Sequence, residues 1–241
     1  MDSEYGGSYR LLYQNHWWWR ARERILRATV ARLSLPSRPS ILDFGCGDGL
    51  AFPMLREFGE VCGIEVDVSL LDPANPDRSA IRSAPLASGA YGDERHDLIT
   101  ALDAIEHIED DAGTLRQLFA MLRPGGFLLL TVPACMSLWD EHDEINRHFR
   151  RYSRQALQEA LPASAELVEL RFLFASLFPP KWLLARFNRL RRRKIGQHGI
   201  PAPALNGLLE SWCVLEDRLM RRLRPAFGTS LLALLRCPRR A

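Results

Sequence analysis

The sequence predicts an α/β protein built on a doubly wound, mostly parallel sheet. Short apolar runs alternate along the chain with segments of helical periodicity, which is typical of strands joined by crossover helices. The first run, Ile41 to Phe44, ends in a turn with Gly45, Gly47 and Gly49, which lets a ligand approach bare backbone. The next strand ends in Glu65, twenty residues after Gly45, where a ribose-binding carboxylate is expected.

Seven strands and several helices follow from this pattern. We expect strands over residues 41–44, 61–65, 79–83, 97–102, 127–132, 166–174 and 228–236, with a turn at 124–126 before the fifth, and helices over 8–33, 50–58 and 111–122. In the first helix an apolar stripe from Trp18 to Leu33 is expected to face the core, with Arg20, Arg22, Glu23, Arg24 and Arg27 largely opposite.

Composition places the chain among ordinary globular proteins. Its 241 residues are 47% apolar and 25% charged, enough for one good core. The five cysteines form no ligand-like cluster, so neither a disulfide framework nor a zinc site is indicated. We find no signal-peptide pattern and no run of eighteen apolar residues. We therefore expect a cytoplasmic protein that does not span a membrane.

Charge is distributed unevenly. Residues 171–241 contain fifteen Lys or Arg and three Asp or Glu, whereas residues 1–170 contain seventeen and twenty-six. A basic module on an acidic body favours a partner that carries phosphate or another anion, although basic helices are often simply solvated faces.

Four motifs resemble those of one enzyme family. In order they are ILDFGCGDG, GIEVD, HDLITALDAIEHIEDD and MLRPGGFLLLTVPA. Together they resemble the class I S-adenosylmethionine-dependent methyltransferases over residues 38–175, and more narrowly the small-molecule branch with Glu-His-Ile after the fourth strand (methyltransferase type 11/12-like domains). The resemblance implies a Rossmann-like methyltransferase fold whose last two strands pair as an antiparallel edge, with S-adenosyl-L-methionine as cofactor.

The resemblance also implies a division of the chain. Residues 1–36 would be an N-terminal helical lid, 37–175 the cofactor-binding core, 176–226 a basic helical insertion and 227–241 the final strand. The family usually has only a turn where the insertion stands, and Pro180 and the segment 196–203 suggest a helical hairpin there.

Cofactor-binding residues carry over by motif. Asp43 would fix the turn, the backbone of Gly45, Cys46 and Gly47 would pass under the methionine part, and Glu65 would accept from the ribose hydroxyls. Val66, Leu102, Asp103 and His107 would lie near the adenine and methionine. Ser83 stands near the place where the family commonly has an Asp, which is a departure at the adenine contact.

The polar segment 139–152 follows the fifth strand, in the loop that would face the transferred methyl group. We predict that His142 or His148 supplies a general base, since an imidazole titrates near neutral pH. The residues predicted to bind the acceptor are Trp18, Trp139, Asp143, Arg151 and Tyr152. The spacing of the histidines fits no known ligand pattern, so we predict no metal.

The predicted function is methyl transfer from S-adenosylmethionine to a small or lipid-linked acceptor, favouring oxygen. Two alternatives remain: an NAD(P)-dependent oxidoreductase, and a non-catalytic cofactor-binding module tethered by its basic hairpin. The nucleic-acid branch is disfavoured, because no Asn-Pro-Pro-Tyr-like sequence follows the fourth strand.

Residues 180–194 are predicted to meet an anionic membrane surface. Leu183, Leu184, Phe187 and Leu190 share a stripe beside several arginines. The rival readings are that this stripe packs on the protein itself or that the arginines bind nucleic acid.

Overall fold

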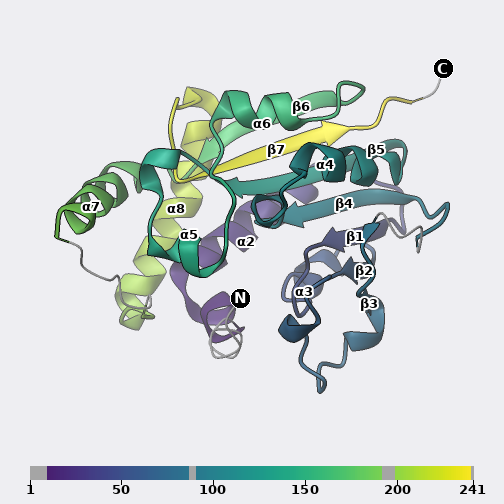
Figure 1. The fold of residues 1–241 in the computed structure, drawn as a ribbon, viewed down its shortest axis with the longest axis horizontal. Helices are drawn as coiled ribbons and strands as arrows, with labels where there is room; N and C mark the ends of the chain where they lie inside the picture. Colours follow the sequence, from purple (N-terminus) through teal and green to yellow (C-terminus); the bar gives the residue numbers. More distant parts are fainter. Residues whose placement is uncertain (1–9, 87–90, 192–198, 240–241) are drawn as a thin grey trace.

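A seven-stranded sheet forms the centre of the molecule (Figure 1). The computed structural model describes residues 10–86, 91–191 and 199–239. The strands lie in the order β3-β2-β1-β4-β5-β7-β6, and only β7 is antiparallel to its neighbours among them. Their bounds are β1 Ser40–Phe44, β2 Glu60–Ile64, β3 Ile81–Arg82, β4 His96–Leu102, β5 Leu122–Pro133, β6 Glu166–Leu173 and β7 Ser230–Arg236. The predicted fold class is confirmed, including the antiparallel edge.

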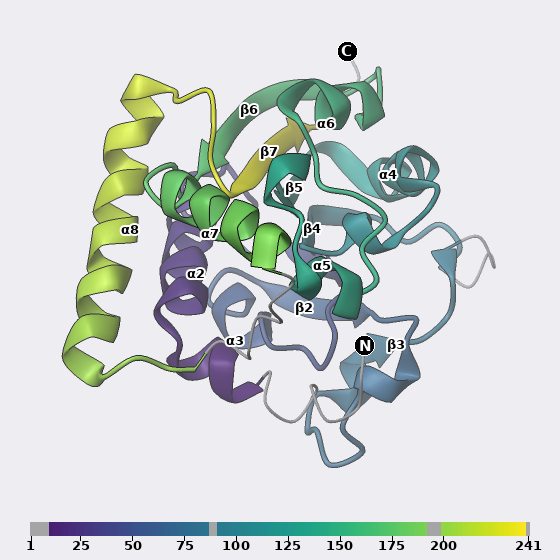
Figure 2. The ribbon, with the colours of Figure 1, turned by 60° about the vertical axis from the view of Figure 1, so that its left-hand side comes forward.

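Helices cover both faces of this sheet. The α-helices are α2 Trp17–Val30, α3 Phe52–Leu55, α4 Asp111–Ala120, α5 Glu141–Ile145, α6 Arg154–Ala160, α7 Phe178–Arg191 and α8 Pro203–Leu223. Short 3₁₀ turns span Val68–Leu70, Arg78–Ala80, Ile105–His107 and Met136–Leu138. In Figure 2, α2 and α8 run side by side on one face, while α4 and α6 lie on the other.

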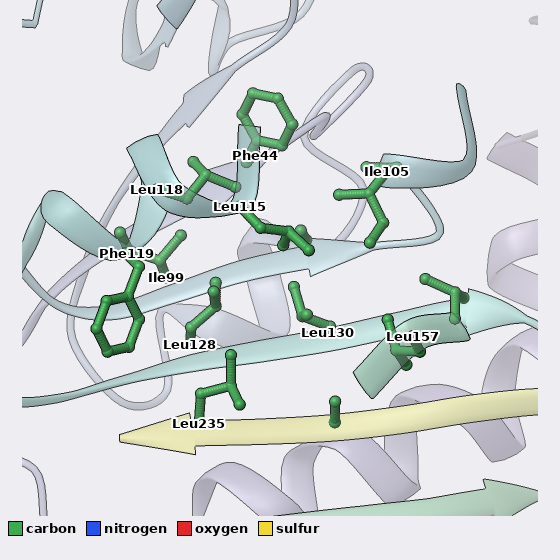
Figure 3. Close-up of a cluster of buried hydrophobic side chains, with 14 of the residues drawn as sticks. Phe44, Ile99, Ile105, Leu115, Leu118, Phe119, Leu128, Leu130, Leu157 and Leu235 are labelled. Atoms are coloured by element: carbon green, nitrogen blue, oxygen red, sulfur yellow. The ribbon is translucent and has the colours of Figure 1, made fainter. Parts of the chain in front are cut away.

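The core follows the two-residue period of the central strands. Leu128 and Leu130 of β5 pack with Leu115 and Leu118 of α4 (Figure 3), whereas Leu129, between them in sequence, packs on the α2 face. Successive side chains of a strand point to opposite faces, so a strand covered on both sides must be apolar throughout. This explains the uninterrupted apolar run in β5.

The strand order reverses at β1, whose neighbours are β2 on one side and β4 on the other. In such sheets a crevice opens beyond the carboxyl ends of the strands at the point of reversal, because the connections leave in opposite directions. Gly45 and Asp103, the residues that follow β1 and β4, both have positive φ, of 66° and 55°. The backbone therefore turns sharply at this edge.

Several predicted boundaries were wrong. The N-terminal helix is broken at His16, whose Nδ1 atom accepts a hydrogen bond from the Trp18 backbone N–H at 3.2 Å and so caps α2. Residues 8 and 9 of the predicted helix lie outside the described residues. Arg22, expected on the solvent face, is buried. The third strand has only two residues, because the preceding three form a 3₁₀ turn.

The predicted turn at 124–126 lies inside β5 as a bulge. His96 pairs with Leu122, and Leu98 pairs with Phe127. The four residues 123–126 of β5 therefore lie opposite a single residue of β4, Asp97. Gly125 supports this bulge with a φ of 85°, a conformation that glycine adopts without strain.

The segment between β6 and β7 contains two helices, as predicted. Helix α7 begins two residues before Pro180, and α8 runs to Leu223. The predicted membrane segment 180–194 is described only in part, since the side chains beyond Phe187 lie outside the described residues. In the described part, no helix combines the length and apolarity needed to cross a membrane.

Truncation of Leu130 is expected to destabilise the fold. Its side chain is fully buried between β5 and α4, so Leu130→Ala leaves a cavity and should lower the free energy of unfolding by about 2–5 kcal/mol. Urea denaturation would measure this. Val168→Ala, at a side chain 48% exposed on β6, is the control and should change stability by about 0.5 kcal/mol or less. Equal losses in the two variants would contradict this placement of the core.

Candidate functional site

The glycine turn after β1 lies against the neighbouring strands. The backbone N–H groups of Gly45 and Cys46 donate to the Ile64 carbonyl at 2.8 and 3.2 Å. A Cβ atom on Gly45 would lie 2.5 Å from the Cβ of Ala104, whereas one on Gly47 would meet nothing within 4 Å. The chain is therefore packed tightly at Gly45 and open toward the cavity at Gly47.

Glu65 follows β2 and reaches back to this turn. Its Oε2 atom accepts a hydrogen bond from the Gly47 backbone N–H at 2.9 Å, and its Oε1 atom accepts one from the Asp67 N–H at 2.8 Å. The residue is only 8% exposed, and burial raises the pKa of its carboxyl group. The predicted acidic residue thus contacts the predicted glycine turn directly.

Asp43 lies beneath the turn. It is buried, and its Oδ1 atom accepts a hydrogen bond from the Thr100 hydroxyl on β4 at 2.6 Å. Burial, opposed by this hydrogen bond and by the charge of Arg22, raises the pKa of Asp43 to about 7.

Arg22 brings α2 to the carboxyl edge of the sheet. Its Nη2 atom lies 2.7 Å from Oδ2 of Asp103 and donates to the Thr131 hydroxyl at 2.9 Å. The guanidinium also lies over the rings of Trp18 and Trp19, at 5.8 and 5.6 Å from their centroids. This role of Arg22 was not predicted, although its spacing of four residues from Trp18 and three from Ile25 places it within the apolar stripe and not opposite to it.

A cavity of about 1350 Å³ opens at this edge. One part of its wall is the glycine turn with Asp43, Glu65, Val66 and Leu102. Another part comes from the segment after β5 and from α7, and includes His142, His148, Arg151 and Lys181. Such a volume holds a nucleoside-sized ligand with room for a second molecule.

His148 in the polar wall of the cavity pairs with a carboxylate that lies behind it. Oδ1 of Asp143 lies 2.8 Å from Nδ1 of His148, and Nε of Arg151 donates to both carboxylate oxygens at 2.9 Å. Burial alone would raise the pKa of Asp143, but the hydrogen bond from His148 and the charge of Arg151 hold it well below its usual range. Asp143 is therefore ionised and accepts the hydrogen bond, so His148 carries a proton on Nδ1, and in the neutral ring Nε2 is the acceptor.

Two more histidines surround His148. The rings of His107 and His142 lie edge-on to it, with centroids 4.6 and 6.3 Å away. Burial lowers the pKa of His107 and of His142 to about 4 in each case. Both rings are therefore neutral at pH 7.

Glu106 completes the cluster from beneath. It is fully buried, and neither carboxyl oxygen has a hydrogen-bond partner among the described residues. Burial and the nearby charge of Asp103 raise its pKa well above the usual range. Ligand atoms of Glu106, His107 and His148 lie within 4.8 Å of one another, a grouping that could hold a metal ion. Sequence spacing did not reveal this grouping, and the absence of a metal stays a prediction.

The cavity brings together most of the predicted residues but not all. Trp18, Asp43, Gly45, Cys46, Gly47, Glu65, Val66, Leu102, Asp103, His107, His142, His148 and Arg151 line it. Ser83, Trp139, Asp143 and Tyr152 do not. Asp143 lies behind His148, and the Tyr152 hydroxyl instead donates to Asp111 at 2.6 Å inside the core. Lys181 lines the cavity from α7 and was not predicted.

Asp43→Asn is expected to remove one component of the pH dependence of stability. The ordinary pKa of 3.8 rises to about 7 on folding, so this component is full below about pH 4 and is lost as pH rises through 7. The free energy of unfolding of the unmodified protein should therefore fall relative to the variant between pH 4 and 7, as measured by urea denaturation. Asp93→Asn, at an exposed side chain, is the control. A difference between Asp43→Asn and the unmodified protein that stays constant with pH would contradict the raised pKa.

Comparisons with known proteins agree with this architecture. A family model described as a methyltransferase domain matches residues 18–165. Malonyl-[acyl-carrier protein] O-methyltransferase of Enterobacter lignolyticus is 31% identical over 154 residues, which is 58% of this chain and 59% of that protein. Ubiquinone biosynthesis O-methyltransferase of Coxiella burnetii is 27% identical over 119 residues, or 46% of each chain. The chain thus spans about half the length of the curated relatives it matches.

A solved structure is similar over nearly the whole chain. It belongs to a complex between the Trm112 methyltransferase activator of Haloferax volcanii and a methyltransferase, with a TM-score of 0.62 and 18% identity, covering 99% of this chain and 96% of that one. At this identity the likeness shows the fold alone, but the family model spans more than half of the chain. The chain therefore belongs to the class I S-adenosylmethionine-dependent methyltransferases.

Proposed function

We propose that this protein transfers the methyl group of S-adenosylmethionine to an oxygen of a small or lipid-linked acceptor. The observation that carries the proposal is that the glycine turn, Glu65 and His148 line one cavity, with Asp143 hydrogen-bonded to His148 from behind. A donor site and a proton acceptor in the same cavity are what methylation of a hydroxyl or carboxyl group requires.

The residues present fit the cofactor. Gly47 offers bare backbone to the cavity, since a side chain there would have open space in front of it, and the two oxygens of Glu65 suit paired ribose hydroxyls. Trp18 and Arg22 would close the site from α2, in keeping with the predicted lid over residues 1–36. When bound, S-adenosylmethionine supplies an activated methyl group on its sulfonium, so the protein mostly holds the reacting atoms in line.

His148 is our candidate for the general base. Asp143 holds its Nδ1–H, which orients the ring and stabilises the positive charge that it gains when Nε2 takes a proton. Arg151 and the capping box of α5 fix Asp143 in turn. Burial lowers the pKa of His142, predicted alongside His148, to about 4, so this ring accepts a proton less readily than an ordinary imidazole. Because Asp143 acts through the ring of His148, we assign it a positioning role.

An oxygen acceptor is favoured over nitrogen because a hydroxyl must lose its proton to attack, whereas a neutral amine has a lone pair available. Two relatives reported above are O-methyltransferases by name, which is in keeping with this choice. Membership of the methyltransferase family counts against the nicotinamide-dependent oxidoreductase. A non-catalytic cofactor-binding module is the remaining alternative.

Loss of the Glu65 carboxylate is expected to weaken cofactor binding. Glu65→Ala removes charge-assisted acceptors worth about 1.5–3 kcal/mol, so the affinity for adenosylhomocysteine should fall roughly ten- to a hundredfold by isothermal titration calorimetry. Glu60→Ala, at the exposed start of β2, the strand that Glu65 follows, is the matched control and should bind normally. Unchanged affinity in Glu65→Ala, or tighter binding of NAD than of adenosylhomocysteine, would contradict the assignment.

Loss of the His148 imidazole is expected to lower kcat. A positioned general base contributes on the order of 10²–10⁴ in rate, so His148→Ala should lose about that factor. His142→Ala should lose less. Turnover would be followed as adenosylhomocysteine formed with a panel of phenols and carboxylic acids.

Asp143→Asn separates positioning from folding. An amide cannot hold the same ring tautomer as strongly, so kcat should fall while the affinity for adenosylhomocysteine stays unchanged. Full turnover in both His148→Ala and Asp143→Asn would refute the base assignment. An unmodified protein that binds cofactor but methylates none of the panel would favour the non-catalytic module.

A further inference from the structure

Helix α8 buries mainly polar side chains and exposes large apolar ones, which is the reverse of an ordinary surface helix. The side chains that it buries are Asn206, Glu210, Cys213, Glu216 and Asp217, four of them polar. Its exposed side chains include a stripe of large apolar residues: Leu205, Leu208, Trp212, Leu215, Leu219 and Leu223, each between 48 and 70% exposed. An amphipathic surface helix normally buries its apolar face and exposes its polar face.

Specific polar contacts fix this inverted orientation. Glu210 pairs with Arg20 and Arg24 of α2 at 2.9 and 3.1 Å, and Asp217 pairs with Arg171 of β6. Glu216 accepts a hydrogen bond from the Ser176 backbone N–H at 2.6 Å. Turning α8 about its axis would break all of these contacts, so the apolar stripe is held outward.

The charges of this region are sorted in the same way. The three acidic residues of the segment 171–241 are the three that α8 buries. Arg218, Arg222 and Arg224 are exposed, and Arg222 continues the spacing of the stripe three residues beyond Leu219. In the described part of α8, the outward face therefore combines leucine and tryptophan with arginine and carries no carboxylate.

Helix α7 extends this surface to the cavity. The two helices lie together at one end of the molecule (left in Figures 1 and 2), and the Trp212 indole N–H donates to the Ser176 hydroxyl just before α7 at 3.0 Å. Leu183 and Leu184 of α7 are 60 and 53% exposed, and Arg186 is exposed beside them. Lys181 and Leu184 also line the cavity. Helix α7 therefore lies between the outer surface and the candidate acceptor site and contributes side chains to both.

From this arrangement we propose that the outward faces of α7 and α8 form a docking surface for an anionic lipid bilayer. Apolar side chains flanked by arginine match the acyl and phosphate layers of such a surface. A second copy of the chain fits less well, because two such faces would bring arginines together without an acid to pair with them. Nucleic acid fits less well too, since it offers no apolar layer for six exposed side chains. The proposal is independent of methyl transfer.

Vesicle flotation tests this surface without any assay of turnover. The full chain should float with vesicles of phosphatidylcholine mixed with phosphatidylglycerol, much less with phosphatidylcholine alone, and less as salt rises. The triple variant Arg186→Ser, Arg218→Ser and Arg222→Ser should lose on the order of a hundredfold in partitioning. The matched control, Arg95→Ser, Arg116→Ser and Arg154→Ser, removes the same charge from exposed positions elsewhere and should float normally.

A second variant tests the apolar contribution. Leu208→Gln, Leu215→Gln and Leu219→Gln together should abolish flotation and leave the thermal unfolding midpoint unchanged or higher, because these side chains are already exposed. Absence of flotation of the unmodified protein at low salt would overturn the proposal. So would flotation by this leucine variant, a stable dimer that fails to bind vesicles, or tighter binding to duplex DNA than to anionic vesicles.

Discussion

The ion pair between Arg22 and Asp103 ties the helical cover of this protein to its sheet. Arg22 is 4% exposed, and a buried guanidinium is tolerated only with well-placed partners, which Asp103 and Thr131 provide at the ends of two strands. The pair sets the position of α2 over the carboxyl edge. Helix α8 then docks on α2 through Glu210, so the outer layer depends on the same anchor.

The carboxyl edge concentrates acidic groups, and the structure keeps them apart by environment. Burial raises the pKa of Asp43, Glu65 and Glu106, whereas Asp143, with two cationic or hydrogen-bonding partners, has a lowered one. Carboxyl groups whose environments drive their pKa values in opposite directions can serve different roles at one pH. Glu106, whose pKa is raised well above its usual range, has no hydrogen-bond partner among the described residues, whereas the ionised Asp143 orients an imidazole.

The sheet and its ligand-facing edge could be predicted from the sequence because both rest on local signals. Apolar strands, glycine spacing and an acid at a strand end are visible in one dimension, and they located Gly45 and Glu65 correctly on the cavity wall. The roles of Arg22 and Tyr152 could not be predicted in this way. Arg22 is buried because a partner 81 residues away meets it, and Tyr152 faces Asp111 across the core rather than the cavity. Long-range pairing leaves no periodicity in the sequence.

The orientation of α8 likewise depends on long-range pairing and could not be predicted from local sequence patterns. From its sequence, the leucine stripe would be assigned to the core, because burying six large apolar side chains stabilises a helix more than a few ion pairs do. The structure buries the polar stripe instead, where Asn206, Glu210 and Asp217 each find partners on α2, β6 or the segment before them. The residues that pair with the polar face of α8 therefore come from elements far apart in the chain. The apolar stripe of α8 therefore stays exposed to water after the chain folds. Burying it against a surface outside the protein would contribute a favourable hydrophobic free energy.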